Sequence, residues 1–129
     1  MVSKFSILGM IVALGIIMYA ISMAGDEKGI ETNTVEMVQG SGAAGCEKTS
    51  TGCYDPVKIT THIGNTVTWK NTDSSSHTVT SGNPNGITGE FDSGMLMAGH
   101  EFSHTFRSSG TYDYFCAIHP WMIGQVVVR

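Results

Sequence analysis

The 129-residue sequence is poor in charged side chains, and it has neither a long run of basic residues nor an internal repeat. Charged residues make up only 14% of the chain, and the formal net charge is −4. Proteins that bind nucleic acid neutralise its phosphates with clusters of Lys and Arg, and this sequence has no such cluster. The composition therefore argues against a nucleic-acid partner.

Helical patterns are also scarce after the first 24 residues, whereas glycine is abundant at 16 residues. Side chains that alternate between two faces predict strands at 57–63, 66–70, 101–107 and 111–116, and further short strands are expected at 34–38, 77–80 and 123–128. We expect 57–63 and 66–70 to form a hairpin around Gly64-Asn65, and the Gly-, Asn- and Pro-rich stretch 81–99 to be a long surface loop. Seven or so short strands joined by turns predict an all-β sandwich or small barrel over residues 34–129.

The N-terminus carries the one long apolar stretch, residues 5–24, preceded by Lys4 and followed by Asp26-Glu27. Since a helix of about 20 apolar residues spans a bilayer, residues 1–25 are predicted to form an apolar helix that anchors the protein. The lysine before the stretch favours an orientation with the rest of the chain outside the cytoplasm. Alternatively, Ser22-Met23-Ala24 provides a signal-peptidase site, and cleavage of residues 1–24 would secrete the protein. Residues 26–33 are then a tether to the domain at 34–129.

An exported protein with three cysteines has one that cannot form an intramolecular disulfide. Cys46 and Cys53 lie close in sequence, and outside the cytoplasm they are expected to form a disulfide. A metal site at this pair is the alternative, but no histidine lies nearby and the spacing fits no zinc pattern. Cys116 is left as a free thiol, and metal ligation is a reason to keep it reduced.

The most informative motif is Cys116, His119 and Met122, three potential ligands that recur every three residues after the strand-like run 112–115. Thiolate and thioether are soft ligands that select copper, and imidazole suits both oxidation states of that metal. A second histidine would complete a trigonal His2Cys site with a weak axial Met, the ligand set of a blue-copper electron-transfer centre.

Four other histidines could supply that ligand: His62, His77, His100 and His104. His62 falls on the polar side of its strand, and His100 borders a glycine-rich loop. His104 shares a face with two phenylalanines and is expected in or near the core. His77 follows a turn and begins a strand, so its side chain can point out of the end of a sandwich. It is the best second imidazole.

Residues 110–122 resemble the copper-ligand loop of the cupredoxins. The Cys-x2-His-x2-Met spacing is similar to that of amicyanins, and the segments 77–82 and 91–94 resemble archaeal halocyanin-like plastocyanins. The resemblance covers about residues 34–129. It implies a Greek-key β-sandwich with one type 1 copper ion, held by His77, Cys116 and His119 in the trigonal plane and by Met122 as axial ligand.

The resemblance also implies that the backbone N–H of Thr78 donates to the cysteine sulfur. Many cupredoxins have Asn where this chain has Thr78, and many plastocyanins and amicyanins have Pro where it has Ile118. The free N–H of Ile118 is predicted to donate a second hydrogen bond to the sulfur, which would favour Cu(I) and raise the potential. An apolar docking surface is expected from Met95, Leu96, Met97, Pro120 and Trp121.

The predicted function is that of a one-electron carrier, not an enzyme, working between redox protein partners such as respiratory complexes outside the cytoplasm. The alternative is a mononuclear copper enzyme in which a small molecule such as nitric oxide reacts at an open axial position. Against it, the sequence has no second histidine cluster and no His-x-His pair of the kind that multicopper oxidases use. Copper storage is disfavoured because most of the eight methionines lie in the apolar N-terminal stretch or singly in loops.

Overall fold

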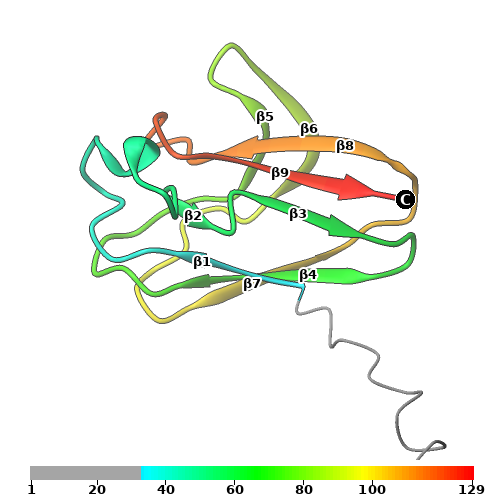
Figure 1. Ribbon diagram of the computed structural model, residues 1–129, viewed down its shortest axis with the longest axis horizontal. Helices are drawn as coiled ribbons and strands as arrows, with labels where there is room; N and C mark the ends of the chain where they lie inside the picture. Colours follow the sequence, from blue (N-terminus) through cyan, green and yellow to red (C-terminus); the bar gives the residue numbers. More distant parts are fainter. Residues whose placement is uncertain (1–32) are drawn as a thin grey trace, which may run out of the picture. The chain divides into compact units, whose positions relative to one another are not determined.

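The computed structural model describes residues 33–129, which form two β-sheets that enclose a common core (Figure 1). In the first sheet the strands lie in the order β2 (Tyr54–Asp55), β1 (Thr34–Met37), β4 (Thr66–Asn71) and β7 (Glu101–Thr105). In the second the order is β3 (Lys58–Thr61), β9 (Ile123–Val128), β8 (Gly110–Phe115), β5 (Thr80–Asn83) and β6 (Gly86–Asp92). Within the described residues the one helical element is the short 3-10 helix η1 (Cys46–Lys48). The predicted all-β sandwich is confirmed.

The chain crosses repeatedly between the two sheets, because β3, β5–β6 and β8–β9 lie in one sheet and β1–β2, β4 and β7 in the other. The neighbouring pairs β1/β4 and β3/β9 are parallel, and all other neighbours are antiparallel. Parallel neighbours need long connections. The antiparallel pairing of β5 with β8, in which Thr80 lies opposite Phe115, brings the loop before β5 and the loop between β8 and β9 together.

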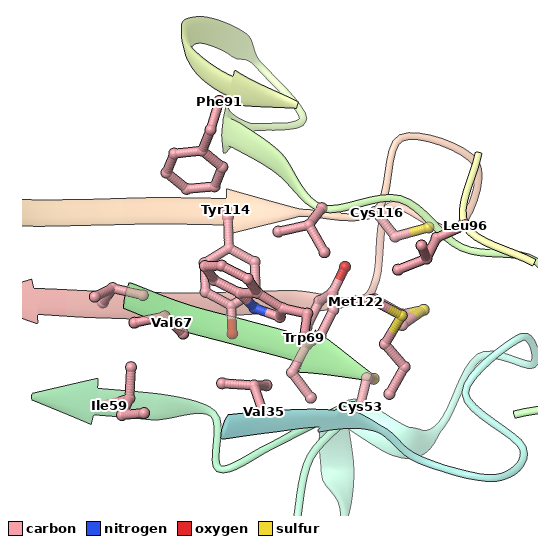
Figure 2. Close-up of a cluster of buried hydrophobic side chains, with 14 of the residues drawn as sticks. Val35, Cys53, Ile59, Val67, Trp69, Phe91, Leu96, Tyr114, Cys116 and Met122 are labelled. Carbon is pink, nitrogen blue, oxygen red and sulfur yellow. The ribbon is translucent and has the colours of Figure 1, made fainter. Parts of the chain in front are cut away.

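The core is built from alternate residues of the strands, as in the pattern of β4, where Val67 and Trp69 are fully buried. Figure 2 shows Trp69 beside Tyr114, and their rings meet edge to face with centroids 5.4 Å apart. Tyr114 and Cys116 are buried on the inner face of β8 and its end, as predicted from their alternation. The thiol therefore lies inside the domain.

The predicted hairpin of 57–63 with 66–70 is wrong. β3 pairs with β9, and β4 pairs with β1 and β7, so the turn at Gly64-Asn65 carries the chain from one sheet to the other. Gly64 donates to the carbonyl of Phe106 at 2.7 Å, and Ile63 donates to that of Arg129 at 3.0 Å. Alternation identified both strands correctly, but it carries no information on which strands become neighbours.

The predicted surface loop at 81–99 is also wrong over its first half, because β5 and β6 form a hairpin that projects from the second sheet (Figure 1). In β6 only Phe91 is buried, so the strand lacks the apolar alternation that marks a half-buried strand. The side chain of Asn83 accepts a hydrogen bond from the N–H of Asn85 at 2.8 Å and closes the turn.

The predictions for the N-terminal segment, namely an apolar helix that anchors or exports the chain and a tether at 26–33, fall almost wholly outside the described residues. No helix between residues 33 and 129 has the length and apolar character needed to cross a membrane.

Candidate metal centre

The structure brings His77, Cys116 and His119 together at one end of the sandwich. His77 precedes β5 and is held by an isolated bridge to Leu96, with N–H···O distances of 3.0 and 2.8 Å. Cys116 directly follows β8, and His119 lies in the loop that leads to β9. Two loops far apart in sequence therefore supply the three donors.

The loop between β8 and β9 is folded back on itself by backbone hydrogen bonds. The N–H of His119 donates to the carbonyl of Cys116 at 3.3 Å, and that of Met122 donates to His119 at 2.9 Å. The N–H of Cys116 donates in turn to the carbonyl of Met122 at 3.0 Å. The three-residue spacing of the motif thus corresponds to successive tight turns, and Met122 ends fully buried in the cluster that contains Cys116 (Figure 2).

The donor atoms converge on one point. The Nδ1 atoms of His77 and His119 are 3.0 Å apart, and the Sγ atom of Cys116 lies 3.9 and 3.7 Å from them. Donors at roughly 2.0–2.3 Å from one metal ion must lie only a few ångström from one another. Two imidazole nitrogens and a thiolate with this spacing fit a copper ion, whose soft and borderline ligands they are.

Asp73 lies behind His77 and is itself buried. Its Oδ2 atom lies 2.7 Å from Nε2 of His77, and it accepts hydrogen bonds from the backbone N–H groups of Gly40 (2.9 Å), Gly42 (3.2 Å) and Ser74 (2.9 Å). Burial acts to raise the pKa of Asp73, but the hydrogen bonds from Gly40, His77, Ser74 and Gly42 lower it to about 2. The carboxylate is therefore charged, and it orients Nδ1 of His77 toward the other donors.

Burial and neighbouring groups shift the pKa values of the three donors in different directions. Burial acts to raise the pKa of the Cys116 thiol, but hydrogen bonds from His77 and from nearby backbone N–H groups lower it. For His77 burial acts to lower the pKa, and its interactions with Cys116 and Asp73 raise it. Burial and the neighbouring His77 lower the pKa of His119. The lowered pKa of Cys116 makes it easier to deprotonate to the thiolate, the form that binds metal.

Thr78 links the two loops. Its backbone N–H donates to Sγ of Cys116 at 3.3 Å, as predicted, and its Oγ1 accepts from the N–H of Ala117 at 2.8 Å. The hydroxyl also lies 2.9 Å from Oγ1 of Thr80. The threonine therefore makes the cross-loop hydrogen bond for which many cupredoxins use Asn.

Replacing Ile118 by Pro should lower the midpoint potential. The N–H of Ile118 is one of the groups that lower the pKa of the Cys116 thiol, and proline has no N–H. Losing an N–H interaction worth about 1 kcal/mol makes the thiolate a stronger donor to Cu(II) and lowers the midpoint potential by roughly 40 mV. Voltammetry measures the shift. Ile118→Ala keeps the N–H and is the matched control, and a Pro variant with the potential of the Ala variant would contradict the assignment.

The remaining histidines do not join the site. The side chains of His62 and His100 are exposed, and His104 lies between the rings of Phe91 and Phe106, with centroids 4.9 and 4.8 Å away. The predicted position of His104 next to the core is confirmed. Burial lowers its pKa, with a smaller opposing effect of Glu90.

The lowered pKa of His104 predicts that the protein loses stability as the pH falls below about 6.5, the value for an unfolded histidine. Below that pH the unfolded chain binds a proton at His104 that the folded protein does not. Binding of this proton lowers the free energy of unfolding by at most about 1.4 kcal/mol for each pH unit. Urea unfolding of the Cu(II) form at pH 7.5 and 5.5 measures this effect. Between these two pH values His104→Phe should lose less free energy of unfolding than the wild type. A loss equal to that of the wild type would contradict the prediction.

The expected apolar surface is only partly exposed. Met95 and Met97 are 61% and 60% exposed, whereas Leu96 between them is 6% exposed and belongs to the core. Pro120 is exposed, and Trp121 is half-buried beside His119, with ring centroids 5.2 Å apart. The apolar surface near His119 therefore lacks Leu96, because its bridge to His77 turns it inward.

Cys46 and Cys53 form the predicted disulfide, and Cys116 is the free thiol. Although Cys46, Glu47 and Cys53 lie close enough to resemble a ligand group, sulfurs joined in a disulfide cannot act as thiolate ligands. The alternative of a second metal site at this pair is thereby removed.

Comparison with known proteins identifies the family. Residues 41–129 match the copper binding proteins of the plastocyanin/azurin family. The chain belongs to this family. It is 32% identical to amicyanin-alpha of Methylorubrum extorquens over 101 residues, which are 78% of this chain and 85% of that protein. It is 38% identical to amicyanin of Paracoccus denitrificans over 78 residues, 59% of this chain and 58% of that one.

Solved structures agree with this assignment. A purple cupredoxin from Nitrosopumilus maritimus superposes with a TM-score of 0.66 and 35% identity, covering 74% of this chain and 98% of the other. An amicyanin variant in its Cu(I) form superposes with a TM-score of 0.58 and 27% identity, covering 80% and 87%. The chain is therefore a cupredoxin whose cofactor is copper, and it acts as an electron carrier, not as an enzyme.

Two residues of the site are not evident from the sequence. Asp73 lies four positions before His77 in a turn-forming run, and an acidic residue so close to a candidate ligand is a weak signal of a carboxylate–histidine pair. Ser41 contacts His77 across 36 positions, and nothing in its local sequence points to the site.

Proposed function

We propose that His77, Cys116 and His119 hold one type 1 copper ion in a trigonal plane and that Met122 is its axial ligand. The convergence of the three donors within 4.8 Å carries this proposal, together with the buried position of Met122 on the same loop. Bound there, copper supplies a one-electron couple. The protein supplies a set of ligands that both oxidation states accept.

The surroundings of the site favour rapid one-electron transfer. Asp73 holds His77, Thr78 holds the sulfur and the loop, and backbone hydrogen bonds hold His119. Ligands fixed in this way move little when the charge at the site changes, which keeps the reorganisation cost of electron transfer small. His119 is the donor nearest to solvent, because His77 and Cys116 are fully buried. Electrons are expected to enter and leave through its ring.

The proposed partners are redox proteins such as respiratory complexes, which dock transiently on the apolar surface around His119. Met95, Met97 and Pro120 are exposed there, and weak electron-transfer encounters use small interfaces of this kind. We place the domain outside the cytoplasm, where the disulfide is stable, and propose that residues 1–25 anchor it to the membrane or, if residues 1–24 are cleaved, export it.

Loading the protein with Cu(II) tests the ligand set. One equivalent should produce an intense thiolate-to-copper band and the narrow copper hyperfine splitting of a type 1 site in the EPR spectrum, and ascorbate should bleach the band reversibly. Cys116→Ala should remain colourless. A colourless wild-type protein, or a Cys116→Ala variant that keeps the band, would refute the assignment. Azide or nitric oxide should leave the spectrum unchanged if Met122 closes the axial position, and a change would favour the enzymatic alternative.

A further inference from the structure

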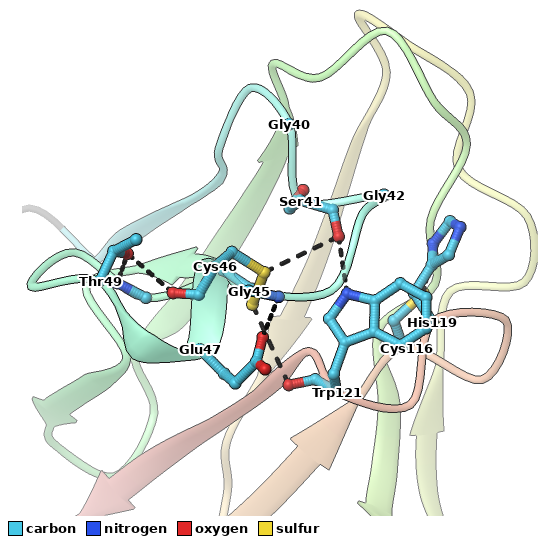
Figure 3. Close-up of a disulfide and its surroundings, with 12 residues drawn as sticks. Gly40, Ser41, Gly42, Gly45, Cys46, Glu47, Thr49, Cys116, His119 and Trp121 are labelled. Atoms are coloured by element: carbon cyan, nitrogen blue, oxygen red, sulfur yellow. Dashed lines mark hydrogen bonds between the residues drawn. A yellow bond between two sulfur atoms is a disulfide. The ribbon is translucent and has the colours of Figure 1, made fainter.

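Ser41 is fully buried and contacts both of the segments that carry the proposed ligands, and Figure 3 shows its contact with Trp121. Its Oγ atom lies 3.2 Å from Nε2 of His77 and 3.4 Å from Oδ2 of Asp73. Its backbone carbonyl accepts the indole N–H of Trp121 at 3.0 Å, in the loop that carries His119. One residue outside the ligand motif thus touches both sides of the site.

The distances indicate where the protons lie. Nε2 of His77 has one N–H to donate, and Asp73 is the nearer acceptor at 2.7 Å. The Ser41 hydroxyl is then free to donate to the same carboxylate oxygen. It therefore withdraws part of the negative charge that Asp73 would otherwise direct at His77.

The disulfide lies directly beside Ser41 and Trp121 (Figure 3). The sulfur of Cys46 is 3.8 Å from the carbonyl oxygen of Ser41, and that of Cys53 is 4.0 Å from the carbonyl oxygen of Trp121. Because a disulfide sulfur carries no hydrogen, these are packing contacts. The backbone of Cys53 also accepts a hydrogen bond from Val38 at 3.1 Å, and Val38 in turn accepts one from Ser41 at 3.1 Å. The cross-link thus lies against the segment that contains Ser41 and is tied to it through Val38.

We propose that Ser41 is a positioning residue that sets the midpoint potential of the copper centre, and that the Cys46–Cys53 disulfide holds it in place. The inference rests on the ligand set proposed above. The hydroxyl weakens the hydrogen bond between Asp73 and His77 by donating to the same carboxylate oxygen, and the backbone carbonyl binds Trp121 to the same segment. The disulfide contacts Ser41 directly, and its other contact, the Trp121 backbone, belongs to the residue whose indole N–H donates to the carbonyl of Ser41.

Ser41→Ala tests the role of the hydroxyl. The backbone carbonyl remains, so Trp121 keeps its hydrogen bond, but Asp73 loses a donor and binds the N–H of His77 more strongly. A more electron-rich imidazole stabilises Cu(II), so the midpoint potential should shift to a lower value while the thiolate-to-copper band is retained.

Ser81→Ala is the matched control, because Ser81 is equally buried and its hydroxyl accepts the N–H groups of Glu90 and Phe91. Both variants should unfold at lower urea concentration, but only Ser41→Ala should change the potential. Equal potentials in Ser41→Ala, Ser81→Ala and the wild type would overturn the proposal, since Ser41 would then be merely structural.

The double variant Cys46→Ala/Cys53→Ala tests the disulfide and provides an independent measurement if Ser41→Ala does not fold. It should shift the potential in the same direction, and adding Ser41→Ala to it should cause no further shift. Fully additive shifts would overturn the claim that the disulfide acts through Ser41. If the wild type lacks the thiolate-to-copper band, the ligand set fails as well. An intact band with unshifted potentials refutes this inference alone.

Discussion

Replacing Asp73 by Asn is expected to weaken copper binding by about 10–100-fold, the usual cost of losing a carboxylate behind a ligand histidine. The carboxylate of Asp73 faces His77 and accepts hydrogen bonds from the backbone N–H groups of Gly40, Gly42 and Ser74. An amide has a single acceptor oxygen, and its NH2 group can accept nothing, so at least one of these N–H groups loses its partner.

The same substitution should raise the midpoint potential. Without the negative charge behind it, the imidazole of His77 donates less electron density, and Cu(II) loses more stabilisation than Cu(I). The shift has the opposite sign to that expected for Ser41→Ala, because one change removes the carboxylate and the other removes a group that weakens its effect.

Copper affinity is measured by competition with a chelator, and the potential by voltammetry. Asp113→Asn is the matched control, because Asp113 is exposed and its carboxylate accepts a hydrogen bond from the side chain of Gln125 at 2.8 Å. If Asp73→Asn and Asp113→Asn bind copper equally well, the carboxylate behind His77 has no part in holding the metal.

Gly124→Ala is expected to destabilise the copper-loaded protein by about 3 kcal/mol, at the upper end of the usual cost of overpacking a core. Gly124 on β9 lies opposite Tyr114 on β8, and a Cβ atom at this position would overlap the phenol ring. The ring is confined by Tyr54 and Trp69, whose centroids lie 4.8 and 5.4 Å away, so it has little room to move.

Gly86→Ala is the control for this prediction, because a Cβ there meets nothing within 4 Å and should change stability by less than about 0.5 kcal/mol. Urea unfolding of both variants gives the difference. A Gly124→Ala variant as stable as Gly86→Ala would show that Tyr114 moves freely, contrary to its fully buried position.

Much of the site could be predicted because its information is local. Cys116, His119 and Met122 recur at a fixed spacing, and counting cysteines identifies Cys116 as the free thiol. Alternation along β8 correctly directs this thiol inward. His77 could be chosen among the histidines because the others lie on exposed or core-facing positions of their segments. The assignment of Met122 as axial ligand stays a prediction.

The pairing of the strands could not be predicted from local sequence patterns. Local alternation shows that a strand is half-buried, but it does not determine which strand becomes its neighbour. β3 and β4 therefore looked like a hairpin, although they belong to different sheets. β6 was not predicted as a strand, because all but one of its residues are exposed and it has no apolar alternation.

The sequence by itself determined the all-β class, the disulfide and the soft-metal chemistry of the chain, since residue type and short spacing are enough for each of these. Only the tertiary structure decided which groups surround the donors. Asp73 and Ser41 reach His77 because the sheets bring residues 40–42 and 71–77 together. Contacts between such distant segments depend on the packing of the whole domain, and no local pattern encodes them.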